Sequence, residues 1–410
     1  MAEPGGRRRR VAWMAPGDGA DYITALPLDL RARIASSLPF WQVAQLATLS
    51  RPWRHIHRHA PVVDLDLDDF LVDTDEILDE EDHPAVFLNE VALARLEVAL
   101  ARRGNDGSGS SMVDTLRIAF NAIDPRMRLH AELIAALAGA RRTCVFIAGL
   151  SRSPPNAWSL DLSPAARVLD IAAEYQSAAP TVAGPGGAAL GTLRLYNVVL
   201  HEWPRLPSLR SLTLGSATIQ APFPEGAWCP RLEDLCIFSS FMELPRVDIR
   251  LPLLKRLEMD EAYFSPGADV AVDAPELEEL DVGCEAGYTA ADYHSFTLRA
   301  PRLRCLTWSD QFAERVHIDV GKPGTVTSGR IEFTSSRAFD YCREMEDIRA
   351  QTMRMLQGLL PDLLPECVAD AARPYVSLEK CTTENPYTGK PVPGEKLTCD
   401  LSGLFSSLKA

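Results

Sequence analysis

The chain has 410 residues, 46% of them apolar, and a formal net charge of −14 at pH 7. This length predicts two or three structural units with a sizeable core. The acidic balance argues against a nucleic-acid-binding protein, because phosphate contacts need clustered Lys and Arg.

Cysteine usage and targeting signals limit the compartment. The nine cysteines show no framework spacing, and neither a signal peptide nor a membrane-spanning apolar run is visible. We therefore expect free thiols in the nucleus or the cytoplasm, and no membrane partner. Residues 1–20 are expected to be a disordered basic tail. Its run from Arg7 to Arg10 is either a nuclear-localisation patch or a solvated chain end.

Residues 21–60 have the pattern of two or three short helices with apolar stripes. Ser50 is suited to be the N-cap of the third helix, with Pro52 in its first turn. A unit this short has too few residues to bury a core of its own, so we expect a partner to cover the stripes. The alternative is that the unit caps the rest of the fold. The stripe residues are Leu30, Ile34, Leu38, Val43, Leu46, Ala47, Trp53 and Ile56.

The segment from Leu26-Pro27 to Leu38-Pro39, followed by Leu49-Ser50-Arg51-Pro52-Trp53-Arg54, resembles the F-box at the front of many plant proteins. The resemblance implies docking to a Skp-type adaptor, which links F-box proteins to a cullin-RING ubiquitin ligase. Family members often have Arg or Lys where Pro52 stands. Carried onto this sequence, the adaptor-binding residues would be Leu26, Pro27, Leu30, Ile34, Leu38, Pro39, Val43, Leu49 and Trp53.

Residues 61–111 are expected to form an acidic linker and a helix. Val63 to Asp68 alternate between apolar and acidic side chains, which predicts a half-buried strand. Asp73 to Asp82 are expected to form a solvated loop. Apolar residues from Ala85 to Arg103, among them Phe87 and Val91, recur at helical spacing, and a Gly- and Ser-rich segment then ends the helix.

After residue 112 the sequence repeats. Five octets have the pattern Pro-x-Leu-x-x-Leu-x-apolar, with 22 to 26 residues between successive prolines. This spacing is the core of a leucine-rich repeat, in which apolar residues two apart point to the same side of a short strand. One repeat cannot bury that side, so we expect a stack over residues 112–335. The octets begin at Pro207, Pro230, Pro252, Pro275 and Pro301, with weaker copies at Val113, Ala166 and Leu190.

The repeats depart from the usual pattern in one respect. Leucine-rich repeats typically place Asn or Cys three residues after the strand, where the side chain hydrogen-bonds across turns. Because none of the five positions here holds either residue, we expect no polar ladder and an irregular solenoid. The positions hold Ala217, Ser240, Ala262, Glu285 and Gln311.

Residues 336–410 are expected to close the stack. Apolar residues recur at helical spacing from Arg337 to Leu360, and Pro361 ends the run. We read this segment as a closing helix, since terminal repeats need a cap. The predicted fold is therefore α/β: a helical F-box at 21–60, a linker at 61–111, an irregular leucine-rich-repeat solenoid (horseshoe) at 112–335, and a closing helix and capping region at 336–410.

The side chains between the buried leucines are expected to point to the concave face of the repeats. The middle of this face is acidic, so it would attract basic segments of a partner, with Phe238 as an apolar anchor. The alternative is an ordinary solvated polar face. The candidate substrate-binding residues are Asp234, Phe238, Glu258, Asp260, Glu279 and Asp281.

The sequence contains no catalytic constellation. His55 and His59 could present two metal ligands on one helix face, but no further ligand is nearby. Gly184 to Ala189 loosely match a dinucleotide fingerprint, and a loop is the favoured reading. We predict a non-catalytic receptor without cofactor or metal, which the family resemblance makes the substrate-recognition subunit of an SCF-type (Skp–cullin–F-box) ubiquitin ligase. The alternative is a repeat scaffold without a ubiquitin role.

Overall fold

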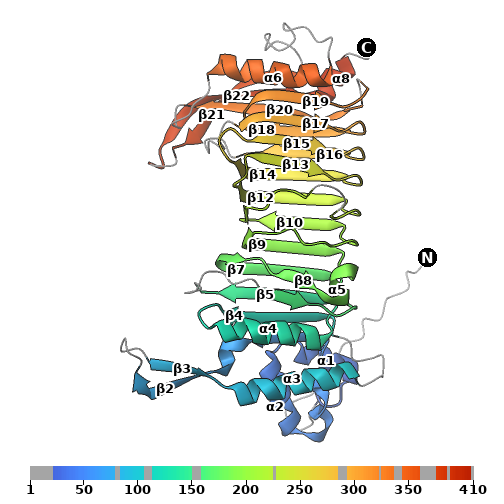
Figure 1. The fold of residues 1–410 in the computed structure, drawn as a ribbon, viewed down its shortest axis with the longest axis vertical. Coiled ribbons are helices and arrows are strands. Elements are labelled where there is room, and N and C mark those ends of the chain that lie inside the picture. The colour runs from blue at the N-terminus through green and yellow to red at the C-terminus, as the bar shows by residue number, and fades with distance from the viewer. Residues whose placement is uncertain are drawn as a thin grey trace, which may run out of the picture.

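The computed structural model describes residues 22–78, 84–105, 113–149, 158–224, 228–284, 293–322, 325–336, 344–360, 375–385 and 388–407. In these residues the fold is mixed α/β. Figure 1 shows strand-rich turns stacked into a long column, with helices at both ends. The helices α1 and α2 lie at the N-terminal end, and α6 (Met345–Leu359) and α8 (Leu401–Ser407) lie at the other.

A 14-stranded sheet, called the front sheet here, runs the length of the column. Its order is β1-β4-β5-β7-β9-β10-β12-β14-β16-β18-β20-β22-β21, and β11 pairs with β9 and β12. Neighbours from β1 to β20 are parallel, whereas β22 and β21 are antiparallel additions. The strands are β1 (Val62–Asp66), β4 (Thr115–Asn121), β5 (Arg142–Ala148), β7 (Val168–Ala178), β9 (Thr192–Leu200), β10 (Ser211–Gly215), β11 (Thr218–Ile219), β12 (Asp234–Met242), β14 (Arg256–Phe264), β16 (Glu279–Gly283), β18 (Cys305–Ser309), β20 (Ser328–Ser336), β22 (Pro391–Asp400) and β21 (Val376–Glu384).

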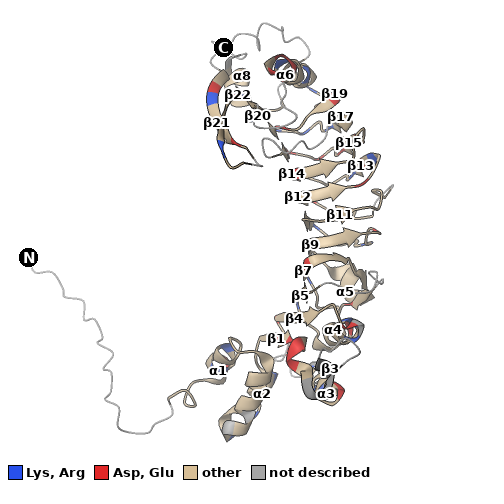
Figure 2. Ribbon diagram, turned by 90° about the vertical axis from the view of Figure 1, so that its left-hand side faces the viewer, with Lys and Arg blue, Asp and Glu red and all other residues tan. Residues whose placement is uncertain are grey.

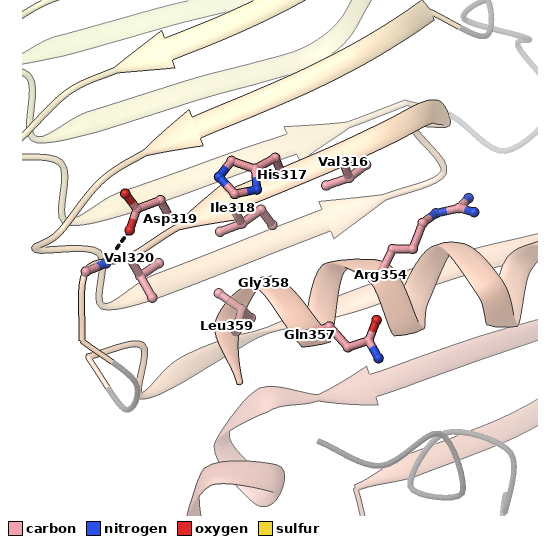
Figure 3. A pocket seen from close by; sticks show the side chains of 10 residues that line it. Val316, His317, Ile318, Asp319, Val320, Arg354, Gln357, Gly358 and Leu359 are labelled. Carbon is pink, nitrogen blue, oxygen red and sulfur yellow. Dashed lines mark hydrogen bonds between the residues drawn. The ribbon is translucent and has the colours of Figure 1, made fainter. Parts of the chain in front are cut away.

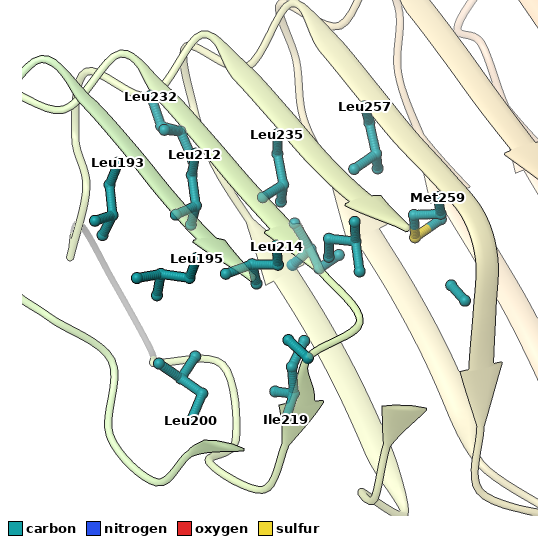
Figure 4. Packing of buried hydrophobic residues seen from close by; sticks show 14 of the residues in the cluster. Leu193, Leu195, Leu200, Leu212, Leu214, Ile219, Leu232, Leu235, Leu257 and Met259 are labelled. Atoms are coloured by element: carbon teal, nitrogen blue, oxygen red, sulfur yellow. The ribbon is translucent and has the colours of Figure 1, made fainter. Parts of the chain in front are cut away.

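Buried leucines hold successive turns together (Figure 4). Leu193, Leu212, Leu235 and Leu257 occupy one register position on four adjacent strands, and all four are buried. The apolar residue two places further on each strand, such as Leu214, points to the same side and is also buried. Burying each such side chain stabilises the fold by about 1.5–3 kcal/mol. The repeated leucines therefore stack as the sequence predicts.

Strands also cover much of the opposite side of the column. A four-stranded parallel sheet, the back sheet, comprises β13 (Arg246–Arg250), β15 (Asp269–Asp273), β17 (Tyr293–Arg299) and β19 (Ala313–Asp319). A pair formed by β6 (Ser159–Asp161) and β8 (Thr181–Ala183) covers earlier turns. Strands on both sides of the column have the same spacing of about 4.8 Å. Because neither side is wider than the other, the stack stays nearly straight. Figures 1 and 2 accordingly show only slight curvature.

Five turns bend at the same place, two residues after the pair of buried apolar residues. The residue at each bend has a positive φ, between 47° and 57°, which is uncommon for a residue other than glycine. Its side chain reaches a neighbouring turn in several cases: Asn197 Nδ2 donates to Glu174 O at 2.8 Å, and Ser239 donates to the Glu261 carboxylate. The bend residues are Asn197, Ser216, Ser239, Glu261 and Asp310.

Two buried side chains also form polar links across turns. Ser240 Oγ accepts a hydrogen bond from Ala217 N at 3.1 Å. Gln311 Nε2 donates to Ala262 O at 3.2 Å and lies 3.3 Å from Gly283 O. The expectation that no polar ladder exists is therefore wrong at two of the five positions, because Ser and Gln supply the bonds that Asn or Cys usually make. Glu285 lies outside the described residues.

The N-terminal unit, residues 22–60, has helices α1 (Leu28–Ala35) and α2 (Phe40–Leu49), followed by 3-10 turns at Arg51–Trp53 and Ile56–Arg58. The third segment is thus not a continuous helix, and Ser50 makes no side-chain capping bond. The unit does bury a small core of its own, contrary to the expectation. Alanines allow this, because their small side chains let short helices approach closely. The core residues are Ala32, Ala35, Val43, Trp53 and Ile56.

The linker contains more regular structure than expected. After β1 and a 3-10 turn at Leu67–Phe70, the strands β2 (Leu71–Leu78) and β3 (Pro84–Leu88) form an antiparallel hairpin. The loop prediction is therefore wrong for the residues up to Leu78, since ladder pairing overrides their acidic composition. Helix α3 (Glu90–Asn105) begins later than expected, with Phe87 in β3.

Two further helices lie on the early turns. Helix α4 (Pro125–Ala138) begins at the N-cap Asp124, whose carboxylate accepts from Arg126 N. Gly184–Ala189 form a short helix, α5, directly after β8, so the loop expectation there is wrong. The glycines suit a close approach: a Cβ at Gly186 would lie 2.2 Å from Ser163 O.

The C-terminal end of the column is closed by α6, which packs along β19 (Figure 3). A Cβ at Gly358 would lie 3.0 Å from Ile318 Cβ, so glycine lets the helix backbone reach the strand. A groove of about 550 Å³ remains beside this contact. The expected closing helix is present from Met345 to Leu359, and the part of that prediction from 337 to 343 lies outside the described residues.

Asp310, at one of the bends, generates a pH prediction. Its carboxylate accepts from Thr334 N and Oγ1, and burial raises its pKa from the ordinary 3.8 to about 6. Between pH 4 and 6, the Asp310 carboxyl is therefore protonated in the folded state and ionised in the unfolded state. The resulting stabilisation is complete below about pH 4 and is lost as the pH rises through 6.

Asp310→Asn keeps an acceptor for Thr334 N and tolerates positive φ. We expect the free energy of unfolding of the wild type, relative to this variant, to fall by about 2–3 kcal/mol between pH 4 and pH 7. Urea denaturation across that range measures the difference. Parallel curves for the two proteins would show that Asp310 does not titrate in this way.

Candidate docking surface and recognition face

Helix α1 has one face turned inward and one turned to solvent. Ala32 and Ala35 are buried, whereas Leu30 and Ile34 are 41% and 44% exposed. Leu28 on the same helix is also exposed, a residue that the sequence pattern did not single out. The unit therefore closes its own core and still presents an apolar row, formed by Leu30 and Ile34 one turn apart, while Leu28 lies on another side of the helix.

The other predicted adaptor-binding residues fall into three groups. Pro27 and Pro39 are exposed directly before α1 and α2, and Leu26 and Leu38 are half-buried. Val43 and Trp53 are buried in the unit's own core. The side chain of Leu49 lies outside the described residues. The structure thus brings Pro27, Leu30, Ile34 and Pro39 to the surface of one short unit.

Arg31 fixes the geometry of this unit, and the sequence pattern gave no sign of it. Its guanidinium lies 5.8 Å from the Trp53 ring centroid and donates to Leu26 O and Pro52 O, at 3.0 and 2.5 Å. Trp53 Nε1 in turn donates to Thr24 Oγ1 at 3.1 Å. These bonds connect the segment before α1 to the 3-10 turn, so Trp53 is a structural residue here.

The unit is joined to the column by buried contacts. Phe40 of α2 belongs to the main core. Arg103 of α3 is buried and donates to His57 O at 2.9 Å and to Ala60 O, and burial lowers its pKa to about 10. Because these carbonyls belong to the last residues of the unit, directly before β1, Arg103 fixes how the unit meets the column.

The predicted substrate-binding residues lie on the outer side of the front sheet, where the parallel register aligns them in columns. Phe238 is opposite Asp260, which precedes Gly283 in the same column. In the next column Glu258 is opposite Asp281. The third column places Arg256 between Asp234 and Glu279. All six predicted residues are therefore on one surface.

Charge is distributed unevenly among these columns. Arg256 lies 3.2 Å from an Asp234 oxygen and 3.6 Å from a Glu279 oxygen, so that column is largely neutralised. Glu258, Asp260 and Asp281, called the acidic triad here, lie together in the other two. Burial, followed by the neighbouring carboxylates, raises the pKa of Asp260 and of Asp281. A cation placed beside the triad would relieve this repulsion.

Phe238 is held by a neighbouring aromatic ring and a glycine. Its ring centroid lies 6.1 Å from that of Tyr196. A Cβ at Gly215 would lie 2.5 Å from Phe238 Cζ, so both rings lie over this glycine. The half-buried Phe238 thus forms an apolar ledge next to the acidic triad.

The described residues contain little that could support catalysis. No group of three or more His, Cys, Asp or Glu side chains among them could hold a metal ion. Burial and nearby positive charges lower the pKa of His57 and of His59. Burial raises the pKa of Cys236 to about 12, so this surface thiol stays protonated. Among the helices in the described ranges, none offers an apolar run of the length that a membrane span requires.

Comparison with known proteins gives two relatives from Arabidopsis thaliana. The chain is 23% identical over 293 residues to an FBD-associated F-box protein, covering 67% of this chain and 54% of the relative. It is 23% identical over 268 residues to F-box/LRR-repeat protein 13, covering 64% and 52%. The chain therefore spans about half the length of the curated relatives it matches. No protein-family model and no solved structure matches it.

The division of α1 and α2 into inner and outer residues can be tested by hydrogen exchange. Val43→Ala leaves a cavity in the small core and should destabilise the unit by about 1–3 kcal/mol. We expect amide exchange in α1 and α2 to accelerate by about tenfold or more. Leu30→Ser with Ile34→Ser should leave exchange nearly unchanged, because both side chains are exposed. Equal acceleration in the two variants would contradict this assignment.

Proposed function

We propose that this chain, which its Arabidopsis relatives support as a plant F-box/leucine-rich-repeat protein, is the substrate-recognition subunit of an SCF-type ubiquitin ligase. In this proposal the N-terminal unit is the F-box and docks a Skp-type adaptor. The outer side of the front sheet captures a protein substrate. The chain itself is not an enzyme and acts in the nucleus or the cytoplasm.

The exposed row on α1 is the observation that carries the docking half of the proposal. Leu30 and Ile34, one turn apart on the same side of α1, remain in solvent although the unit has a closed core beneath them. Burying each of them would stabilise a complex by about 1.5–3 kcal/mol. Together they offset part of an association cost of several kcal/mol, and the exposed Pro27 and Pro39 add further apolar area. A cap on the repeats would instead turn these side chains toward the column.

The acidic triad and the Phe238 ledge support the capture half. Carboxylates that repel one another and lie beside an aromatic ring suit a basic segment with an apolar residue next to it. The ligase complex would then hold that segment near a ubiquitin-transferring enzyme. Its contribution is to raise the effective concentration of the acceptor lysine rather than to perform chemistry.

Adaptor binding separates this proposal from the scaffold alternative. We expect co-expression with a plant Skp-type adaptor, followed by pull-down, to recover a complex with the wild-type chain. Leu30→Asp with Ile34→Asp should abolish recovery, because charges would replace the apolar row, and Leu26→Ala with Pro27→Ala should weaken it.

Phe241→Asp is the matched control, since Phe241 is an apolar residue of similar exposure on β12, far from α1. It should bind the adaptor like the wild type. A folded wild-type chain that fails to bind would favour a repeat scaffold without a ubiquitin role. Loss of binding in the control would show that recovery does not depend on α1.

Substrate capture by the outer side of the front sheet is tested by reversing the charge of the acidic triad. Glu258→Lys, Asp260→Lys and Asp281→Lys together should remove proteins that co-purify with the wild type in a salt-sensitive manner, because the triad would then repel basic segments. Quantitative mass spectrometry of the co-purified proteins measures the loss.

A variant with Glu379→Lys, Glu384→Lys and Glu395→Lys changes the net charge equally on the exposed β21–β22 hairpin. It should keep the same co-purifying proteins. If the triad variant also keeps them, this face does not capture the substrate.

A further inference from the structure

Helix α3 exposes an apolar stripe on the side opposite the core. Leu93, Leu96 and Leu100 are buried, as the helical spacing predicts. Val91, however, is 64% exposed, and Val98 is also exposed, with Ala94 between them. The helical period places these three side chains on one outward face. Sequence spacing alone groups Val91 with the core.

Helix α4 extends this face. The two helices lie side by side and are joined by Glu90 with Arg126, at 3.6 Å, and by Glu97 with His130, at 2.9 Å. Leu129, which is 62% exposed, is followed one turn later by the exposed Leu133. We call this surface the helical platform; its residues are Val91, Ala94, Val98, Leu129 and Leu133.

Basic side chains border the platform. A groove of about 680 Å³ runs along α3 and is lined by Val91, Ala94, Val98 and Ala99 together with Arg95 and Arg102. Glu90 also lines its start, and that carboxylate lies 3.6 Å from Arg126. The two arginines are two turns apart, and within the described ranges neither forms an ion pair. They stand out in a chain whose net charge is −14. The groove therefore combines exposed apolar area with uncompensated positive charge.

We propose that the helical platform docks an amphipathic helix of a partner protein, with acidic residues flanking its apolar stripe. A stripe that recurs every three to four residues along α3 fits the ridges of another helix. Carboxylates on the flanks of that helix would pair with Arg95 and Arg102. Figure 2 shows α3 and α4 on the other side of the chain from α1, so this surface is separate from the proposed adaptor contact.

The test uses the full chain and a fluorescein-labelled peptide of about 18 residues, with Leu at every third or fourth position and Glu on the flanks. Fluorescence anisotropy should show saturable binding to the wild type. Val91→Ser with Val98→Ser should weaken binding about tenfold or more. Arg95→Glu with Arg102→Glu should also weaken binding of the Glu-flanked peptide. This variant should instead bind a peptide in which Lys replaces Glu on the flanks.

Leu30→Ser with Ile34→Ser is the matched control, because it removes an exposed apolar row from another helix. It should bind the Glu-flanked peptide like the wild type. Equal binding of the Glu-flanked and Lys-flanked peptides to the wild type would overturn the proposal. Failure of the Glu-flanked peptide to bind the wild type would also overturn it. So would sedimentation that shows Val91→Ser with Val98→Ser converting a dimer to a monomer, because the occupant of the platform would then be a second copy of the chain.

Discussion

Parallel stacking of the leucine-bearing strands is the constraint on which the rest of the structure depends. No single turn can bury the side of its strand that carries Leu212 or Leu235, so each turn is stable only against its neighbours. The register that buries these leucines also fixes the side chains between them on the opposite side of the front sheet. The alignment of Glu258 with Asp281, and of Phe238 with Asp260, is therefore a consequence of core packing. A recognition surface built this way can change its outward residues without altering the fold.

The bends complete this arrangement. In five turns, a residue with positive φ follows the pair of buried apolar residues. It bends the chain at the same position of each turn, two residues after that pair. The side chains there and one position later, such as Asn197 and Ser240, bond to adjacent turns. These polar links satisfy backbone groups that the change of direction would otherwise leave unpaired in the interior. Irregular composition is thus compatible with a regular path, because Asn, Ser, Asp and Gln can each supply the bond.

The stacking of this fold is predictable from the sequence, and the details of its packing are not. Five octets of one pattern at regular intervals are enough to indicate the stacking. The strands of the back sheet carry a weaker signal. An alternating segment with two apolar residues, as in Arg246–Arg250 and Asp269–Asp273, recurs just before the proline of the next octet, but five residues of varying type stand out less than the leucine octets. The small core of the N-terminal unit is hidden for a different reason: Ala32 and Ala35 fill it, so the larger Leu30 and Ile34 of the same helix face outward. Periodicity shows that a helix has an apolar face, and packing decides which apolar residues occupy it. Spacing alone places the six candidate substrate-binding residues on one surface, but the neutralising position of Arg256 requires the register between strands.

The two ends of a stacked column present a problem that its middle does not have, since their last turns have a neighbour on one side only. At the C-terminal end α6 and the β21–β22 hairpin cover the open turn, and Gly358 lets the helix lie directly on β19. At the N-terminal end, α3 and α4 cover the first turns and bury Leu93, Leu96 and Leu100. The outer sides of these two helices, however, leave Val91 and Leu129 in solvent. Arg103 then secures the N-terminal unit through backbone carbonyls, so its position does not depend on the outward side chains of α1 or α3. Because the joint is made by buried groups, both exposed apolar surfaces remain free to bind partners while the orientation of the unit relative to the front sheet is maintained.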